Sequence, residues 1–417
     1  IVAGNSLTIP SFFKNRYRDH KNIIKIVSAS IIAVFFTVYT ASAFSSGAKL
    51  FATLFSDSAS GDENYNRVYV IGLIVAAVVI LVYTFMGGFK AVCTTDLIQG
   101  LMMIVAILTV PVLAYAILTF DTSFSSALAA KGVEQPAQFL NFFVNGDGTP
   151  VSAVSIISNL AWGLGYFGMP HILVRFMAVK SNEEIKKSRK IAVVWVIISL
   201  TASCLIGLIA RGYLTAQLDD ATSESVFIRT IQQLFSGNGV LIFIGGIFLC
   251  GILAAIMSTA DSQLLVTASA VSEDLYKGAV KKNASEKSSL LVGKIAVAVV
   301  AVIAFFIALN PKSSIMGLVS DAWAGFGSAF GPVVLLALFW KRSTLSGAIS
   351  GMATGALTVI IWDYIPLVNG QTLYAATNLY SLVVGFGLAL IVNVVVSLLS
   401  KKPSKEITDE FDSIKNI

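Results

Sequence analysis

The chain has 417 residues, of which 56% are hydrophobic and only 12% are charged. A soluble globule of this size needs far more surface charge, so the composition excludes a soluble protein and indicates an integral membrane protein. The formal net charge of +6 also suits a nucleic-acid-binding protein, but the basic residues fall in alternate loops, which is a pattern of membrane topology.

About ten apolar stretches are long enough to cross a bilayer core of about 30 Å, which needs roughly 20 residues of helix. They lie near residues 24–46, 68–86, 97–118, 153–177, 192–213, 239–267, 289–309, 315–339, 344–366 and 375–399. The first two dozen residues are basic and polar and lack a cleavable signal pattern, and residue 1 is Ile. We therefore expect the chain to begin inside a longer protein.

The loops divide into two sets by charge. Lysines and arginines gather at 14–25, 90, 180–190, 277–287, 341–342 and 401–405, whereas the two long loops, 119–152 and 214–237, lie on the opposite side. Positive loops face the cytoplasm, so an even number of spans leaves both chain ends cytoplasmic. We predict a transmembrane domain over 1–400 and a polar, mobile cytoplasmic tail over 401–417, in a multi-pass protein of a bacterial plasma membrane.

The predicted span at 153–177 has the composition of a helix that breaks inside the bilayer. Three glycines and a proline interrupt its apolar run between residues 158 and 176. Backbone groups freed in hydrocarbon cost several kcal/mol unless they line a cavity or bind a ligand, so such breaks are typical of transporters and channels. Trp162, Tyr166 and Pro170 are spaced by four and share one helix face. That face suits the wall of an apolar pocket or a contact between helices.

Polar side chains interrupt the predicted span at 239–267. The hydroxyls of Ser258 and Thr259 and the carboxylate of Asp261 fall in an otherwise apolar run. Hard oxygens in a dry place suit a small cation such as sodium, although serine and threonine in membrane helices also bond to the preceding turn. An acid inside a span is a functional candidate because burying a charge in a membrane is costly.

Asp96, with Thr94 and Thr95, lies where the predicted span at 97–118 begins. These residues suit a helix cap, and the depth of Asp96 also matches that of the two hydroxyls, so a shared cation route is compatible with the pattern.

Three further polar residues fall in or near spans. Asp321 opens a glycine-rich segment, 321–332, that we interpret as a gate or packing element. His171 is interpreted as a structural donor, and Arg175 is expected to extend to the lipid headgroups.

Motifs of enzymes are absent from credible positions in the sequence. We find no catalytic triad, zinc-protease helix, phosphate-binding loop or dinucleotide fingerprint, which argues against an enzyme and against transport driven by ATP. Cys93, Cys204 and Cys250 lie in or beside spans without a CxxC pair, a pattern that predicts neither a disulfide nor a metal site.

Four motifs, in the same order along the chain, resemble the sodium/solute symporter family and, within it, the proline-transporting branch. They occupy residues 87–96, 162–176, 254–259 with 273–277, and 322–332, and the resemblance runs from residue 7 to about residue 400. It implies an all-α integral membrane protein with about ten transmembrane helices of a five-plus-five inverted-repeat fold. Because the family has about three more helices before this point, the resemblance implies an N-terminally incomplete chain.

By the same resemblance the protein is a sodium-coupled symporter that imports L-proline by alternating access, with Na⁺ as the co-transported ion. The residues that match the family's sodium site are Ser258, Thr259, the carbonyl of Ala255, and Asp96; those that match its proline pocket are Tyr39, Trp162, Tyr166 and Pro170. Met169 stands where the proline-transporting branch has glutamine, and this departure keeps other substrates open, such as pantothenate, a sugar or a monocarboxylate. A membrane sensor without transport is the alternative from another class.

Overall fold

The computed structural model describes residue 6 and residues 8–56, 62–86, 89–179, 181–220, 222–281 and 283–415. Positions 87 and 88 of the first motif, and position 7, where the resemblance begins, lie outside the described residues. Among the described residues the regular elements are helices, apart from a short antiparallel hairpin of β1 (Pro366–Val368) and β2 (Gln371–Thr372), in which Pro366 pairs with Thr372.

Nine helices in the described residues are long and apolar enough to span a membrane. They are α2 (Ile23–Phe55), α3 (Glu63–Met86), α4 (Phe89–Leu118), α9 (Asn182–Tyr213), α11 (Gly239–Ser269), α12 (Glu286–Ala308), α13 (Ile315–Phe339), α14 (Leu345–Tyr364) and α16 (Ser381–Leu399). A π-helix, η2 (Ala270–Val280), continues α11 without interruption. These nine match nine of the ten predicted stretches.

The remaining predicted stretch, 153–177, forms two separate helices, α7 (Ala153–Gly165) and α8 (Pro170–Met177). The predicted break within 158–176 is therefore confirmed, and it falls at residues 166–169. Pro170 lacks a backbone N–H and fits the first turn of a helix, so it marks the start of α8.

Side-chain caps start several of these helices. Ser152, Ser181, Ser285 and Ser314 each precede a helix and accept a hydrogen bond from the backbone N–H three residues ahead. Such caps satisfy donors that the helix itself leaves unpaired. The middle of each of these helices is mostly apolar, as expected for a helix in a membrane.

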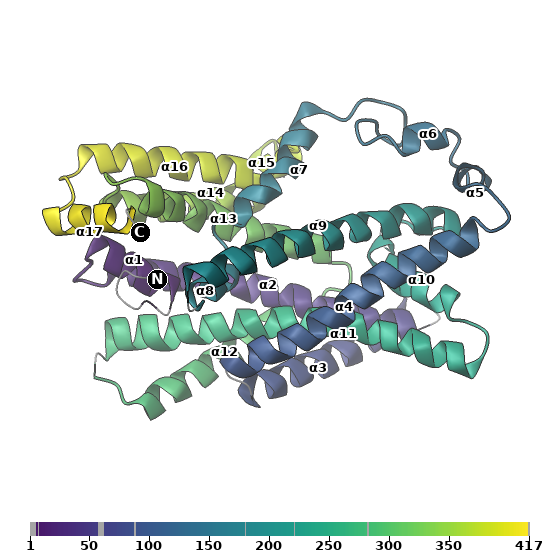
Figure 1. Cartoon of the computed structure of the whole chain (residues 1–417), viewed down its shortest axis with the longest axis horizontal. Helices are drawn as coiled ribbons and strands as arrows, with labels where there is room; N and C mark the ends of the chain where they lie inside the picture. The colour runs from purple at the N-terminus through teal and green to yellow at the C-terminus, as the bar shows by residue number, and fades with distance from the viewer. Residues whose placement is uncertain are drawn as a thin grey trace.

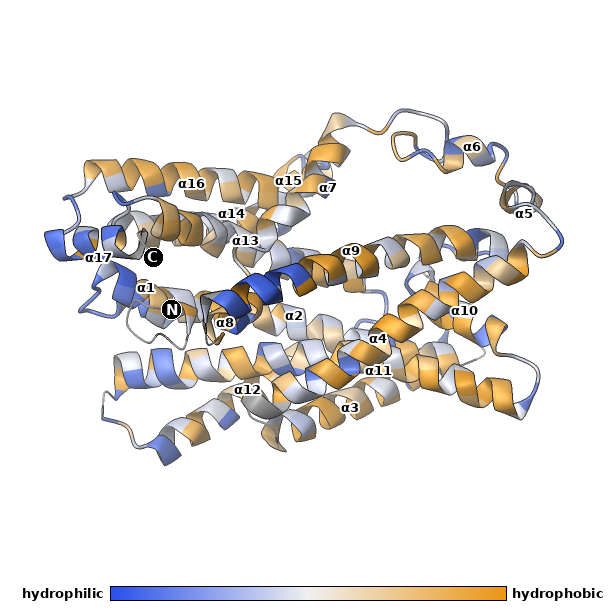
Figure 2. Cartoon of the chain, viewed as in Figure 1, coloured by the Kyte–Doolittle hydropathy of each residue, from blue (hydrophilic) through white to orange (hydrophobic). Residues whose placement is uncertain are grey.

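Both chain ends lie at one end of the helix bundle, and the long loops lie at the other (Figure 1). The loop end carries the short helices α5 (Phe124–Ala130), α6 (Pro136–Phe139), η1 (Ser223–Ser225) and α10 (Val226–Leu234). The terminal end carries α1 (Ile9–Tyr17) and α17 (Lys405–Lys415), and hydrophilic residues gather there (Figure 2). A last short helix, α15 (Leu373–Thr377), follows the hairpin. The predicted separation of the long loops from the chain ends is confirmed.

The C-terminal tail differs from the sequence-based expectation, because its residues 405–415 form a helix that packs on the N-terminal helix. Arg18 pairs with Glu410 at 2.7 Å and with Glu406 at 3.3 Å, and Lys341 pairs with Asp412. The guanidinium of Arg16 lies 5.2 Å from the ring centre of Phe411. The sequence analysis did not anticipate these basic partners, because Lys341 and Arg18 lie 71 and 392 positions away from the acidic residues they bind.

The core lies around α13. One apolar cluster joins α13 to α1, α2, α14 and α16, and a second cluster joins α2 to α3, α11 and α12. In the most apolar window of α13, 78% of the residues are buried, whereas the corresponding share for α9 is 11%. Helix α13 is therefore the internal support against which α7 packs.

Candidate functional site

The break between α7 and α8 sits directly against α13. A methyl group added at Gly165 would overlap the indole of Trp323, and one added at Gly168 would overlap the carbonyl oxygen of Phe326. Glycine is needed at both positions because only hydrogen fits in this contact. The Trp323 indole N–H donates to the carbonyl oxygen of Trp162 at 2.9 Å, which satisfies an acceptor in the last turn of α7.

Aromatic rings surround the break on the α13 side. The ring of Trp162 stacks on Tyr380 with centroids 5.6 Å apart and lies 5.8 Å from Trp323. Tyr166 meets Trp323 edge to face at 4.9 Å, and 41% of the Tyr166 residue surface remains exposed. The Trp162 ring is thus packed against the rings of Trp323 and Tyr380, and the Tyr166 ring is partly exposed. Trp323 and Tyr380 were missed as partners of Trp162 by sequence reasoning.

Tyr39 and Pro170 belong to the other side of the break. The Tyr39 ring on α2 meets the His171 ring edge to face at 6.2 Å, and His171 also contacts Phe36 at 5.7 Å. The structure therefore separates the four predicted substrate residues into two pairs. Trp162 and Tyr166 lie against α13, whereas Pro170 begins α8 next to His171, whose ring Tyr39 of α2 contacts.

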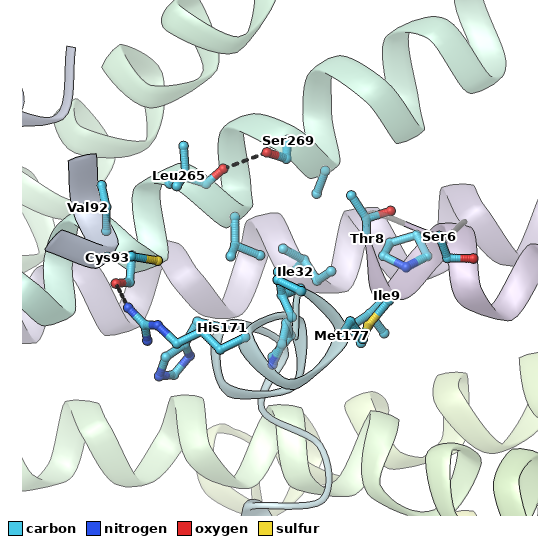
Figure 3. Close-up of a pocket in the computed structure, with 18 residues that line it drawn as sticks. Ser6, Thr8, Ile9, Ile32, Val92, Cys93, His171, Met177, Leu265 and Ser269 are labelled. Carbon is cyan, nitrogen blue, oxygen red and sulfur yellow. Dashed lines mark hydrogen bonds between the residues drawn. The ribbon is translucent and has the colours of Figure 1, made fainter. Parts of the chain in front are cut away.

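A cavity of about 310 Å³, the inner cavity, opens beside α8. Its lining is mostly apolar and comes from α1, α2, α4, α8, α11 and η2. Figure 3 shows His171 and Cys93 at one end of this cavity, Ser6 and Thr8 at the other, and Leu265 and Ser269 along one side. Because Ser6 and Thr8 belong to the N-terminal segment, the inner cavity extends toward the end of the bundle that holds both termini.

A second cavity of about 380 Å³, the ion cavity, brings three of the predicted sodium residues together. Asp96 from α4 lines it together with Ser258 and Thr259 from α11. Ala255 lies one turn before Ser258, and the Ser258 hydroxyl donates to the Ala255 carbonyl at 3.5 Å. The Ala255 residue itself lines a different cavity, on the loop side of the bundle. The structure thus joins Asp96, Ser258 and Thr259 and does not place Ala255 on the same wall.

Arg175 is the main correction to the sequence analysis at this site. Its guanidinium pairs with the Asp96 carboxylate and donates to the Ser262 hydroxyl at 2.7 Å, so it turns inward and does not extend to the headgroups. The Ser262 hydroxyl in turn donates to the carbonyl oxygen of Ser258 at 2.8 Å. The ion cavity therefore already holds one cation of the protein, attached to α8.

Two buried carboxylate oxygens near this guanidinium lack a hydrogen-bond partner among the described residues. They are Oδ1 of Asp96 and Oδ2 of Asp261, and Asp261 is completely buried. Buried anionic oxygens without partners are costly, so they favour the binding of a cation. The oxygens of this region are hard donors of the kind that sodium prefers; Asp261 is fully buried, and Asp96, Ser258 and Thr259 are partly buried.

The inner end of the site is held by another buried carboxylate. Asp274 of η2 accepts hydrogen bonds from Lys25 at 2.8 Å, from Thr8 at 3.1 Å and from Ser11 at 3.0 Å. These bonds fix α1 and the start of α2 against η2, beside the mouth of the inner cavity. The family resemblance included residue 274 in a motif, but the residues alone gave no signal for this contact.

The segment 321–332 is a packing element. Residues 322–332 are all buried, and Asp321 at its start accepts a hydrogen bond from the Tyr364 hydroxyl. This outcome agrees with the packing interpretation of the glycine-rich segment, and it explains why the adjacent α7 approaches so closely.

At the loop end of the bundle, an ion pair joins α2 to η1 and to the residues before α13. Lys49 of α2 pairs with Glu224 of η1 at 2.5 Å and donates to the Ser313 carbonyl at 2.7 Å. Glu224 also accepts from the Met316 backbone N–H at 3.2 Å and from the Ser314 hydroxyl at 3.0 Å. Burial by itself raises the pKa of the Glu224 carboxyl, but these donors outweigh burial and hold its pKa below the usual range.

Known proteins that resemble this chain share a single family. The family model described as "Sodium:solute symporter family" matches residues 2–355. The chain belongs to this family. A protein named sodium/proline symporter 2, from Staphylococcus saprophyticus, is 42% identical over 424 residues, which cover 100% of this chain and 77% of that protein. A sodium/proline symporter from Staphylococcus aureus matches with the same identity and coverage.

The fold agrees with that of a solved member of a transporter family. A sodium-coupled sialic acid symporter, in a substrate-bound outward-open state, matches with a TM-score of 0.67, 18% identity, and coverage of 95% of this chain and 78% of that chain. At this identity the likeness concerns the fold alone. It confirms the expected all-α membrane-transporter fold of this symporter family.

Proposed function

We propose that this protein is a sodium-coupled symporter that imports L-proline by alternating access, with Na⁺ as the co-transported ion. The observation that carries the proposal is the ion cavity, in which Asp96, Ser258 and Thr259 converge beside a membrane helix that is interrupted at residues 166–169. Relatives named sodium/proline symporters, 42% identical over the whole chain, support the choice of ion and substrate.

Sodium suits the ion cavity for a chemical reason. Two hydroxyls and a carboxylate are hard oxygen donors, and the buried oxygens without partners on Asp96 and Asp261 supply negative charge. A monovalent cation offsets that charge without requiring a full cage of acidic ligands. We assign Ser258, Thr259 and Asp96 to the sodium site, with the carbonyl of Ala255 as an additional ligand that becomes available when α11 adjusts.

Proline suits the aromatic side of the break. Its ring is small and apolar, and it packs on the faces of aromatic side chains. Tyr166 has an exposed face next to Trp162, and Tyr39 approaches the same break from α2 through His171. We assign Trp162, Tyr166, Tyr39 and Pro170 to the substrate pocket. Coupling follows if sodium and proline each favour the same conformation, because each then raises the affinity for the other.

We also propose the orientation of the chain in the membrane. The protein is a multi-pass membrane protein, and its two termini share the end of the bundle where hydrophilic residues gather (Figure 2). The positive-inside rule assigns that end to the cytoplasm of a bacterial cell. Residues 1–400 then form the transmembrane domain, and 401–417 form a cytoplasmic tail that docks through α17.

Counterflow of labelled substrate in liposomes tests the proposed function. Liposomes loaded with unlabelled proline should accumulate labelled proline when sodium is present on both sides, and they should not do so when potassium replaces sodium. Parallel liposomes loaded with pantothenate, glucose or lactate test the other substrates. Accumulation of one of these in place of proline would reject the substrate, and equal proline signals in sodium and potassium would reject the coupling ion.

A further inference from the structure

Arg175 occupies the boundary between the two cavities. The ion cavity and the inner cavity share Cys93, His171, Arg175 and Ser262 in their linings. The guanidinium spans this boundary, since it holds Asp96 of α4 on one side and Ser262 of α11 on the other. A single side chain of α8 therefore ties together the two helices that carry the sodium-binding oxygens.

The charges around Arg175 make it a competitor of any bound cation. Asp96 and Asp261 supply two carboxylates, and the guanidinium is a permanent positive charge because arginine stays protonated in proteins. Its bond to Asp96 uses one oxygen of that carboxylate and leaves Oδ1 without a partner among the described residues. A sodium ion that binds Asp96 would meet this guanidinium at close range, and like charges in a dry environment repel strongly.

We propose that the guanidinium of Arg175 is a tethered cation that occupies the Asp96 carboxylate when sodium is absent and is displaced when sodium binds. The inference rests on the proposed sodium coupling and adds a positioning residue to it. Arg175 transfers the state of the ion cavity to α8, and its displacement opens the boundary toward the inner cavity.

The construction of α8 allows it to respond. The break at 166–169 separates α8 from α7, so the backbone of α8 is not held by the helical hydrogen bonds of α7 and can shift relative to Trp162. His171 lies one turn before Arg175 on the same face of α8, and its ring contacts Tyr39. A displacement of Arg175 therefore reaches a residue of the proposed substrate pocket through one helical turn.

Sodium binding measured without substrate tests this inference. Trp195 of α9 lines the ion cavity, so the change in tryptophan fluorescence on addition of sodium reports occupancy in the purified full chain. Arg175→Gln removes the competing charge and should lower the half-saturating sodium concentration about fivefold or more, as expected for the loss of a charge-assisted bond. Arg229→Gln changes an arginine at the loop end of the bundle and should leave this concentration unchanged.

Two further variants keep the inference falsifiable. Arg175→Lys retains the charge but not the two-sided fork, so it should lower the half-saturating concentration about twofold, and it replaces Arg175→Gln if that variant does not fold. In an Asp96→Asn background, Arg175→Gln should have no further effect on sodium binding. An unchanged or raised sodium requirement in both Arg175 variants, or a full effect that persists without Asp96, would overturn the proposal.

The outcomes separate this inference from the proposed function. If proline counterflow fails but Arg175→Gln still tightens sodium binding, the substrate is wrong and the tethered cation stands. If the wild-type protein binds sodium and exchanges proline while the Arg175 variants bind sodium as it does, the tethered cation alone is rejected.

Discussion

The two sides of the broken helix are built differently. Helix α13, which supports α7, is 78% buried in its most apolar window, whereas the corresponding shares for α4 and α9 are 22% and 11%. The side of α13 is packed through glycines and stacked rings, and the side of α4, α8 and α9 surrounds cavities and buried charges. The aromatic half of the proposed site thus packs on a closely packed helix, and the ionic half lies on helices that share fewer contacts with the rest of the bundle.

The two halves of the interrupted helix therefore differ in how firmly their surroundings hold them. Close packing resists small displacements because a core without voids has no alternative arrangement of low energy. Helices that line cavities lose fewer contacts when they shift, so they carry the conformational change. We expect substitutions on the α13 side to act on stability and substitutions around the ion cavity to act on sodium affinity.

The largest effect is expected at the contact between α7 and α13. Gly165→Ala places a methyl group inside the indole of Trp323 and should destabilise the protein by about 3 kcal/mol or more. Gly163→Ala is the matched control, because nothing lies within 4 Å of a methyl group at that position. Thermal unfolding in detergent measures both. Equal stability of the two variants would show that α13 is not the rigid half.

The second effect concerns the ion cavity. Ser258→Ala combined with Thr259→Ala removes two hydroxyl donors and should raise the sodium concentration for half-maximal proline uptake about tenfold, with little change in unfolding temperature. Ser203→Ala removes a hydroxyl on α9 that donates to the Ser199 carbonyl of its own helix, and it should leave uptake unchanged. An unaltered sodium dependence in the double variant would remove these two residues from the sodium site.

A smaller effect is expected at the loop end, through Glu224. The folded-state pKa of this carboxyl lies below its usual value of 4.5, so its stabilising contribution is present above about pH 4.5 and is lost as the pH falls through the folded-state pKa. Glu224→Gln should cost on the order of 1 kcal/mol at neutral pH and should flatten the acid limb of the stability curve. Thermal unfolding between neutral and acid pH measures both changes.

Glu134→Gln, at an exposed position in the loop 119–152, serves as the control for Glu224. Its stability curve should follow that of the wild-type protein. An acid limb that is as steep in Glu224→Gln as in the wild-type protein would show that the ion pair with Lys49 does not hold the loop end together.

The smallest effect is expected for the docked tail. Glu406→Gln with Glu410→Gln removes both partners of Arg18 and should cost about 0.5 kcal/mol or less, because these pairs are partly exposed. Raising the salt concentration should mimic the double variant in the wild-type protein, since exposed ion pairs are screened. Limited proteolysis of the tail at low and high salt measures the release. If the resistance of the tail to proteolysis changes with neither salt nor substitution, Phe411 is the main contact.

The sequence predicted the break between α7 and α8 and the polar interruption of α11, because both depend on local composition. Glycines and Pro170 inside an apolar run, and hydroxyls inside another, are visible without any tertiary information. The identity of the family came from the same segments. The fold followed from these features together with the spacing of the apolar stretches.

The missed contacts have a common physical cause, namely that they join segments far apart in the chain. Arg175 and Asp96 are separated by 79 positions, and the partners of Arg18 in α17 are almost 400 positions away. From sequence alone, a basic side chain near a helix end is expected to extend to the headgroups. Only the tertiary structure shows that a carboxylate lies beside Arg175. The packing of Trp162 between Trp323 and Tyr380 likewise depends on how three helices meet, which periodicity does not reveal.

The π-helix η2 follows α11 directly, so the pattern of backbone hydrogen bonds changes at residue 270 without a break in the helix. In η2 the bonds join residues five apart, whereas in α11 they join residues four apart, so η2 is the wider and less tightly wound of the two. Within η2, Asp274 is held by Lys25 of α2 at 2.8 Å. A shift in the position of that junction along the helix would therefore twist Ser258 and Thr259 slightly about the helix axis relative to the fixed Asp274, while the helix stays continuous.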